Sequence, residues 1–245
     1  MTTTLDAANE LAPTGRIRAA INFGNPVLAQ RDPATGDARG VTGDIARELA
    51  KRLGLPLTIV PYEQAGNVSD AATRDEWDIA FLAVDPKRAA EIEFTAPYVI
   101  IEGVYVVPEG SPIRANGDVD RDGVRVSVIK GSAYQLYLSR TLKHAQIVQA
   151  PTAEEAVANF ERDKLDVLAG VKAPQQRYVE SRSGMRMLEG RFMAIEQAMG
   201  VPKGRLAGVR YLRGMLEELK SSGFIAAALE RSGQRSAQVA PAVKL

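Results

Sequence analysis

The feature of this sequence that most constrains its fold is a short internal similarity. Residues 74–81 read RDEWDIAF and residues 162–169 read RDKLDVLA, so both follow the pattern Arg-Asp-x-apolar-Asp-apolar-apolar. In each copy a helical stretch precedes the pattern and a buried strand follows it. We expect Asp75 and Asp163 to end these helices in the left-handed conformation, which Asp tolerates better than most residues. Helix–turn–strand units are common enough for coincidence, but the similarity favours two lobes of one design over one continuous sheet.

The first part of the chain reads as a strand, a helix and a second strand. The predicted strands are residues 16–21 and 57–60. The helix between them is marked by a capping residue, an apolar face and a stop, which are Thr42 or Asp44, then Ile45, Leu49 and Leu53, then Gly54 and Pro56. A strand–helix–strand unit implies a parallel sheet.

The second part of the chain contains further elements of both kinds. They are a strand at 124–129, a helix at 152–160 with Thr152 as N-cap and Glu155 at the capping-box position, and helices at 206–219 and 224–229. The tail from Ser232 is polar, and we expect it to be frayed. The chain is therefore predicted to be an α/β protein.

Composition excludes several classes of function. Of 245 residues, 45% are hydrophobic and 25% are charged, as in ordinary globular proteins. The formal net charge is +1, so the chain lacks the excess of positive charge that is typical of proteins that bind nucleic acids or anionic membranes. Cysteine is absent, so disulfides, thiol nucleophiles and thiolate metal sites are excluded. His144 is the only histidine, which rules out a multi-histidine metal site. We expect neither a metal nor a cofactor.

The N-terminal residues and the most apolar stretch of the chain indicate where the protein is located. Residues 1–10 carry Asp6 and Glu10 and lack the basic start and apolar run of a secretory signal. Residues 98–107 are interrupted by Glu102 and are too short to span a bilayer, so we expect no membrane insertion. The sequence as given predicts a cytoplasmic protein, or a periplasmic one if a signal has been trimmed.

Two segments have the chemistry of an anion-binding site. Residues 126–134 (VSVIKGSAY) form a strand, a turn and a helix start, where unpaired N–H groups attract anions; the alternative is an ordinary βα turn capped by Ser132. Arg88 follows a buried strand and Asp85-Pro86 and falls at the start of a predicted helix, where its planar fork matches a carboxylate. The alternative for Arg88 is a solvated side chain that pairs with Glu91 or Glu93.

Residues 85–98 (DPKRAAEIEFTAPY) resemble the signature of family 3 extracellular solute-binding proteins, in which an Arg is followed by Phe, a hydroxylated residue and Pro-Tyr. The matching positions here are Arg88, Phe94, Thr95, Pro97 and Tyr98. Gly40 with residues 44–54 is similar to the first helix of that family, and residues 128–132 (VIKGS) to its second anion-binding turn. The resemblance covers about residues 16–232.

The resemblance implies a two-lobed type II periplasmic-binding-protein fold, in which each lobe is a mostly parallel sheet flanked by helices and a hinge joins the lobes. Lobe 1 would comprise residues 14–104 and 197–240, and lobe 2 residues 105–196. The chain would cross between lobes near 105–108 and 198–203. Residues 1–13 and 241–245 would be flexible tails.

The resemblance also implies which residues contact the ligand. Arg88 would grip a carboxylate with help from the turn of Lys130, Ser132 and Ala133, and the lobes would close on the ligand. This chain departs from the family at the other positions. Phe81 and Ala83 replace small hydroxylated residues, Val171 followed by Lys172 replaces the Asp that holds an α-ammonium group, and Phe23 with Asn25 occupies the region of an aromatic residue.

We therefore predict a solute-binding protein for a small anionic organic molecule with a carboxylate, which is not a standard α-amino acid. Lys172 could grip a second anionic group. If the protein is exported, an ABC transporter permease is the expected partner. Members of the family that have become enzymes offer an alternative, a cyclohexadienyl-dehydratase-like activity, which requires a carboxylic acid in the cleft. Asp85 and Glu102 are the nearest acids, but none stands at positions 171 and 172, so we rank binding above catalysis and assign no catalytic residue. A ligand-sensing domain of a larger receptor is a third alternative.

Overall fold

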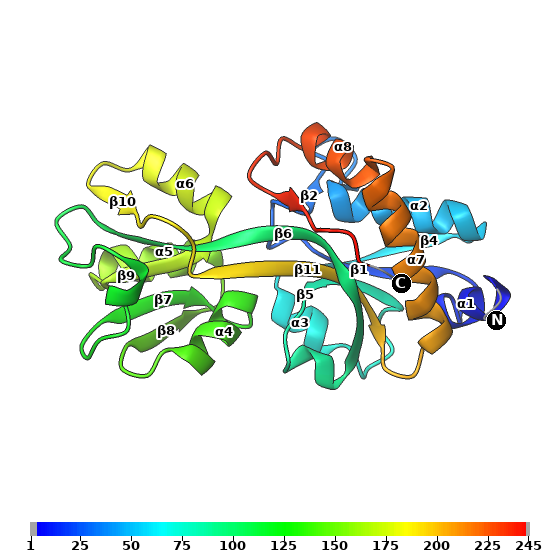
Figure 1. The fold of residues 1–245 in the computed structure, drawn as a ribbon, viewed down its shortest axis with the longest axis horizontal. Coiled ribbons are helices and arrows are strands. Elements are labelled where there is room, and N and C mark those ends of the chain that lie inside the picture. The colour runs from blue at the N-terminus through cyan, green and yellow to red at the C-terminus, as the bar shows by residue number, and fades with distance from the viewer. Residues whose placement is uncertain (1–3, 244–245) are drawn as a thin grey trace. The chain divides into compact units, whose positions relative to one another are not determined.

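The computed structural model describes residues 4–243, which form two compact units (Figure 1). Unit 1 comprises the chain up to Ile100 and from Glu196 onward, and unit 2 comprises Ile101–Ile195. Two long strands, β6 (Ile92–Pro108) and β11 (Met193–Pro202), carry the chain from one unit into the other. The changes of unit thus fall within these strands, slightly earlier in the sequence than the crossings at 105–108 and 198–203 that we expected.

Unit 1 contains a sheet in the order β4-β1-β5-β11, of which the first three strands are parallel and β11 is antiparallel. Its remaining strands are β1 (Ile17–Asn22), β4 (Leu57–Tyr62), β5 (Ile79–Ala83), the hairpin β2 (Gln30–Arg31) with β3 (Ala38–Arg39), and β12 (Gln238–Val239). Its helices are α1 (Thr4–Leu11), α2 (Val41–Leu53), α3 (Ala65–Asp70), the 3₁₀ turn η1 (Arg88–Ala90), α7 (Leu206–Ser221) and α8 (Phe224–Arg231).

Unit 2 repeats the same arrangement. Its sheet has the order β8-β7-β9-β6, again with three parallel strands and one antiparallel strand. The other elements are β7 (Arg125–Ile129), β8 (Gln146–Ala150), β9 (Val167–Val171), β10 (Met185–Met187), η2 (Asn116–Asp118), α4 (Ala133–Thr141), α5 (Ala153–Arg162) and α6 (Lys172–Ser181). The prediction of an α/β fold with two lobes of one design is confirmed. The expectation of two lobes instead of one continuous sheet is wrong in its second part, because the neighbouring strands β11 and β6 join the two strand sets into one sheet.

The internal similarity has a structural cause that is the same in both units. Asp78 immediately precedes β5, and its Oδ2 accepts hydrogen bonds of 3.0 Å from both the backbone N–H and Nε of Arg18 on the neighbouring strand β1. Asp166 precedes β9 and accepts a hydrogen bond of 2.8 Å from the backbone N–H of Arg125 on β7. Each carboxylate therefore ties the start of one parallel strand to the next.

The left-handed residue differs between the two copies. Asp75 has a φ of 52°, as we expected, but in the second copy Lys164 has a φ of 48° while Asp163 has a φ of −91°. The prediction for Asp163 is thus wrong by one residue. The carbonyls of Asp163 and Lys164 accept hydrogen bonds from the guanidinium of Arg125, which holds this turn in its own geometry.

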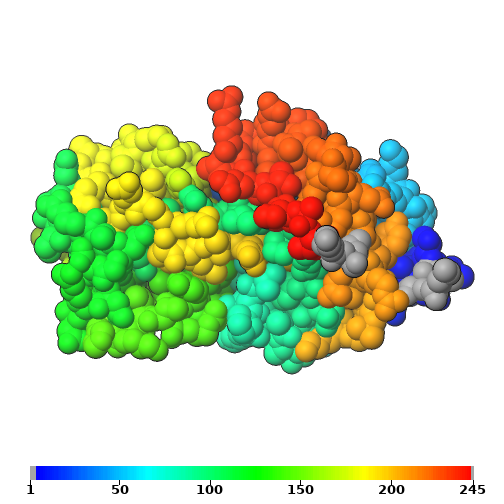
Figure 2. Space-filling view, in the orientation of Figure 1, coloured from blue at the N-terminus to red at the C-terminus, as the bar shows by residue number. Residues whose placement is uncertain are grey.

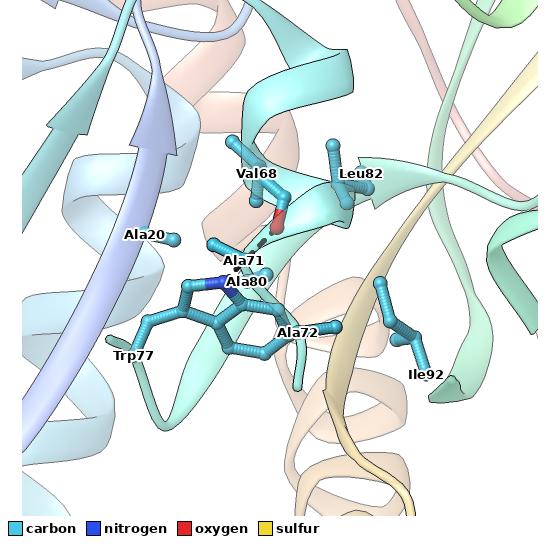
Figure 3. Close-up of a cluster of buried hydrophobic side chains, with 8 residues drawn as sticks. All are labelled: Ala20, Val68, Ala71, Ala72, Trp77, Ala80, Leu82 and Ile92. Atoms are coloured by element: carbon cyan, nitrogen blue, oxygen red, sulfur yellow. Dashed lines mark hydrogen bonds between the residues drawn. The ribbon is translucent and has the colours of Figure 1, made fainter. Parts of the chain in front are cut away.

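The core of unit 1 contains the only tryptophan of the chain, Trp77 (Figure 3). Its indole Nε1 donates a hydrogen bond of 3.0 Å to the carbonyl of Val68 at the end of α3, which satisfies the one polar atom of the ring. The ring packs among small and branched side chains, which are Ala20, Ala71, Ala72, Ala80, Leu82 and Ile92. This packing fixes the strand β5, which leads directly to Arg88.

Of two expectations about helix starts, one is confirmed and one is corrected. Thr152 Oγ1 accepts a hydrogen bond of 3.1 Å from the N–H of Glu155, so this predicted cap is confirmed. The N-cap of α2 is Gly40 rather than Thr42 or Asp44, because the chain turns there with a φ of 96°, and the hydroxyl of Thr42 donates to the carbonyl of Leu28 instead.

The terminal segments that we expected to be flexible or frayed are ordered where the structure describes them. Ala7 and Leu11 of α1 are buried, and Glu10 Oε2 accepts a hydrogen bond of 2.8 Å from the N–H of Gly208 at the start of α7. Near the other end, β12 pairs with Val99 and Ile100 of β6. In the space-filling view, α8 and the segment around β12 lie next to each other on the surface of unit 1 (Figure 2).

Candidate functional site

The candidate residues of each unit follow adjacent parallel strands. In unit 1, Phe23 and Asn25 come after β1, and Arg88 comes after its neighbour β5. In unit 2, the turn 130–133 comes after β7, and Lys172 comes after its neighbour β9. Ligands of open parallel α/β sheets bind at this carboxyl edge of the strands, so each unit gathers its candidates where such a sheet binds ligands.

Arg88 is buried, with only 3% of its surface exposed. Its Nη1 donates a hydrogen bond of 2.9 Å to the carbonyl of Ala83, the last residue of β5. The interpretation of Arg88 as a solvated surface arginine is therefore wrong, and Glu93 pairs instead with Arg213, with 3.6 Å between the charged atoms. The helix that we expected to begin near Arg88 is a single 3₁₀ turn, because the chain enters the long strand β6 at Ile92.

The buried environment of Arg88 disfavours the charged form of its guanidinium group. Burial lowers the pKa of the Arg88 guanidinium to about 10, and the negative charges of Asp85 and Asp70 act in the opposite direction. Asp85 is itself buried and accepts a hydrogen bond of 2.8 Å from the backbone N–H of Lys87. At neutral pH Arg88 is still a cation, and an added carboxylate would improve its electrostatic environment.

The strand that precedes Arg88 supplies apolar surface. Phe81 is buried and meets the ring of Tyr98 edge to face, with 6.1 Å between centroids and an interplanar angle of 88°. Ala83 is also buried and has no polar side-chain atom. β5 therefore brings to the neighbourhood of Arg88 an apolar wall without a side-chain hydroxyl.

The segment after β1 is engaged in local contacts. The guanidinium carbon of Arg31 lies 4.1 Å from the centroid of the Phe23 ring, and Arg31 Nη2 lies 2.5 Å from Glu63 Oε1. One face of Phe23 is thus covered by a cation. Asn25 Oδ1 accepts a hydrogen bond of 3.3 Å from the N–H of Val27, so this side chain stabilises its own turn.

The turn after β7 is built as a capped helix start. Ser132 is the N-cap of α4, and its hydroxyl accepts a hydrogen bond of 3.1 Å from the N–H of Gln135. Gln135 Oε1 in turn accepts a hydrogen bond of 3.0 Å from the N–H of Gly131. Lys130 is exposed and Ala133 is buried at the first helical position. The hydroxyl of Ser132 therefore serves the helix, as in the alternative interpretation of this turn.

The residues after β9 include an ion pair that the sequence did not predict. Val171 is the last residue of β9 and the N-cap of α6. Lys172 Nζ lies 2.6 Å from Glu102 Oε2, and Arg191 Nη1 lies 3.5 Å from Glu102 Oε1. Lys172 is thus paired within its own unit, and its binding of a second anionic group of the ligand stays a prediction. Glu102, a candidate acid for the enzyme alternative, is flanked by two cations.

Sequence reasoning also missed the close packing of Gln175 against Gly170. Gln175 is buried in the first turn of α6, and its Nε2 lies 2.0 Å from the place where a Cβ of residue 170 would stand. Helical side chains lean toward the helix N-terminus, so this amide folds back over the end of β9. A glycine before the predicted ligand residues Val171 and Lys172 was the only signal of this arrangement in the sequence.

Replacing Gly170 with alanine should displace the Gln175 amide and destabilise the protein. Overpacking of this kind costs about 1–3 kcal/mol, which urea unfolding would detect as a lower midpoint with an unchanged slope. Gly110→Ala is the matched control in the same unit, because an added Cβ there meets nothing within 4 Å. Equal stability of Gly170→Ala and the wild type would contradict the packing described.

Two features are absent from the described part of the chain. Between Thr4 and Val243, no group of three or more His, Asp or Glu side chains is placed to bind a metal ion. No helix in the same range is both long and apolar enough to cross a membrane.

Several proteins of solved structure share this fold. A mutant of ArgBP from T. maritima has a TM-score of 0.77 and 21% identity, covering 94% of this chain and 100% of that chain. The solute receptor for L-cysteine of Neisseria gonorrhoeae has a TM-score of 0.77 and 21% identity, covering 93% of this chain and 92% of that chain. The ancestral amino-acid-binding protein AncCDT-1, a precursor of cyclohexadienyl dehydratase, has a TM-score of 0.75 and 19% identity over 91% of this chain and 97% of that chain. At these identities the likeness shows the fold alone.

A curated relative and a protein family are recognised from the sequence. The membrane-bound lytic murein transglycosylase F of Shewanella sp. (strain W3-18-1) is 29% identical over 107 residues, which are 43% of this chain and 22% of that protein. The chain thus spans only about a fifth of that relative's length. Residues 17–234, which are most of the chain, match the bacterial extracellular solute-binding proteins, family 3. This protein belongs to the family 3 bacterial extracellular solute-binding proteins.

Proposed function

We propose that this protein binds a small organic solute through a carboxylate group and that Arg88 is the residue that pairs with it. The observation that carries the proposal is a buried guanidinium at the carboxyl edge of the unit 1 sheet. A guanidinium has five N–H donors in a planar fork that matches a carboxylate, and one of those of Arg88 is bound by the carbonyl of Ala83. Charge-assisted bonds of this kind gain strength where water is excluded.

The proposed ligand lacks an α-ammonium group. An ammonium needs acceptors, preferably a carboxylate, because burying it without one is costly. Val171 offers no side-chain acceptor at the end of β9, and the nearby carboxylate of Glu102 is already flanked by Lys172 and Arg191. A hydroxy, keto, aromatic or dicarboxylic acid fits these residues better than a standard amino acid. Phe81 and Phe23 suit an apolar or aromatic body.

Membership of the family supports a role in transport. The family is described as extracellular, and a relative of the same fold is an amino acid ABC transporter substrate-binding protein from Streptococcus pneumoniae bound to L-arginine. We therefore place this protein outside the cytoplasmic membrane as a receptor that delivers its ligand to an ABC transporter permease.

Catalysis is the weaker alternative. AncCDT-1 is described as an amino-acid-binding protein and a precursor of the dehydratase, so likeness to it does not favour dehydratase activity. A dehydratase requires a carboxylic acid in the cleft, and no acid stands at positions 171 and 172. The stretch shared with the murein transglycosylase is too small a part of that protein to carry its activity over.

Thermal unfolding in a panel of matched ligands tests the proposal. The panel pairs L-phenylalanine and L-leucine with the 2-hydroxy, 2-oxo and unsubstituted acids of the same skeletons. At about 100 times Kd a ligand stabilises the folded state by about 2.7 kcal/mol, which for a chain of this size raises Tm by roughly 5–10 °C. We expect such a rise for the carboxylic acids and none for the amino acids.

Phenethylamine, which has the body of phenylalanine without its carboxylate, is the matched control and should leave Tm unchanged. Strong stabilisation by the L-amino acids, with none by their deaminated analogues, would show that the proposed ligand class is wrong.

A further inference from the structure

Gln197 is a polar residue in an apolar row of β11. Side chains two residues apart on a strand share a face, and the residues that share the face of Gln197 are Ile195, Met199 and Val201. All three are buried, with exposed fractions of 0–1%. Gln197 is also buried, with 5% of its surface exposed. An amide thus stands where the pattern of the strand calls for a hydrophobic side chain.

Between Thr4 and Val243 no residue forms a hydrogen bond with the side chain of Gln197, and its amide atoms are not among the enclosed polar atoms that lack a partner, so they retain contact with solvent. Leucine or methionine at this position would preserve the apolar row. The packing of β11 therefore does not explain why a glutamine occupies this position.

The register of the sheet places Gln197 beside the proposed carboxylate anchor. Gln197 is directly opposite Ala83 in the antiparallel pair of β11 and β5. Side chains of directly opposite residues lie on the same face, with Cβ atoms about 4.5–5.5 Å apart. The carbonyl of Ala83 is the group that accepts the hydrogen bond from Arg88. Ala83 has no polar side-chain atom, so the polar side chain of this cross-strand pair is that of Gln197.

We infer that Gln197 is a specificity-determining residue whose carboxamide hydrogen-bonds a hydroxyl or carbonyl group of the ligand close to its carboxylate. This inference rests on the proposed function and narrows it to hydroxy or keto acids. An amide offers both an N–H donor and an oxygen acceptor, so it can bind either group without a charge. The apolar neighbours Ala83 and Met199 leave this recognition to Gln197.

Calorimetric titration of the wild type and Gln197→Leu with the acids of the panel tests the inference. In the wild type, the 2-hydroxy or 2-oxo acid should bind about tenfold more tightly than the unsubstituted acid of the same skeleton, as the loss of one hydrogen bond to a buried amide implies. In Gln197→Leu this preference should disappear, with the affinity for the unsubstituted acid unchanged. Gln197→Met serves the same purpose if the leucine variant does not fold.

Two controls separate the possible outcomes. Gln149→Leu makes the same change at an exposed strand position of unit 2 and should keep the wild-type preference. If carboxylates bind and Arg88→Met abolishes their binding, but Gln197→Leu keeps the preference for the hydroxy or keto acid, the inference is wrong and the proposed function stands. A uniform loss of affinity for all acids in Gln197→Leu would indicate a structural role and also overturn it. If no acid of the panel binds to the wild type, the proposed function and the inference fail together.

Discussion

Arg88→Met should lose nearly all affinity for carboxylate ligands while folding as stably as the wild type. Truncating one partner of a buried, hydrogen-bonded charge pair costs on the order of 2–5 kcal/mol, which is about thirtyfold to a few thousandfold in Kd. Calorimetric titration with the tightest acid of the panel measures this loss. Wild-type affinity in Arg88→Met would end the proposal that Arg88 is the anchor.

The stability of Arg88→Met is informative because we expect the free energy of unfolding to stay nearly unchanged while the affinity for carboxylates falls. The pKa of Arg88 is about 10 in the folded protein and higher in the unfolded chain, so above about pH 10 there is a window in which the unfolded chain holds a proton that the folded protein has released. Stability contributed by this group therefore rises with pH through that window, and at neutral pH the buried charge opposes folding. Loss of the attraction to Asp85 and Asp70 offsets the gain from removing that charge.

We therefore expect the Tm of unliganded Arg88→Met to stay close to that of the wild type. A merely structural arginine would behave in the opposite way, with a large fall in Tm and a loss of binding only through unfolding. Arg88→Lys separates the two roles further, because it keeps a cation but lacks the planar fork that pairs with a carboxylate through two bonds. It should fold and bind the acids more weakly than the wild type.

Asp78→Asn should destabilise the protein more than any other single change considered for unit 1. The side chain of Asp78 is fully buried, and its Oδ1 lies 2.9 Å from Arg18 Nη2 and 2.9 Å from Arg205 Nη1. Arg205 is the N-cap residue of α7 and also donates a hydrogen bond of 3.0 Å to the carbonyl of Glu10 in α1. One carboxylate thus joins β1, β5 and α7, and the same arginine reaches α1.

Removing one partner of a buried ion pair costs about 3–5 kcal/mol, which for a chain of this size lowers Tm by roughly 6–20 °C. Differential scanning calorimetry of the unliganded protein measures the fall. Asp166→Asn is the matched control from the internal similarity, because its side chain is 39% exposed and lies 3.5 Å from Arg125 Nε. An exposed pair contributes up to about 1 kcal/mol, so equal losses in the two variants would contradict the role given to burial.

The pH dependence of Asp78 provides a second measurement. Burial raises the pKa of its carboxyl, but hydrogen bonds from Arg18 and Arg205 outweigh burial and hold the pKa below the ordinary value of 3.8. The stability that Asp78 contributes is therefore complete above about pH 4 and is lost as the pH falls through the lower value of the folded protein. Asp78→Asn should remove this part of the acid sensitivity.

The sequence by itself determined the fold class and the repeated design. Local patterns carried this information, because an apolar period, a capping hydroxyl or a helix stop depends on residues a few positions apart. Thr152 caps α5, β5 is buried along its whole length, and Asp78 and Asp166 precede equivalent strands. The position of Arg88 after a buried strand was likewise visible, and its interpretation as a ligand-binding residue stays a prediction.

Only the tertiary structure decided which side chains meet. Lys172 and Glu102 are 70 positions apart, and no local pattern showed that their charges are paired. Gln197 faces Ala83 because of the strand register, and α1 is ordered because Glu10 caps a helix that begins nearly 200 residues later. The physical reason is common to all three cases. From the sequence alone, a charged or amide side chain has many potential partners, and long-range packing selects one of them. This selection determines whether the group stabilises the fold or remains available to a ligand.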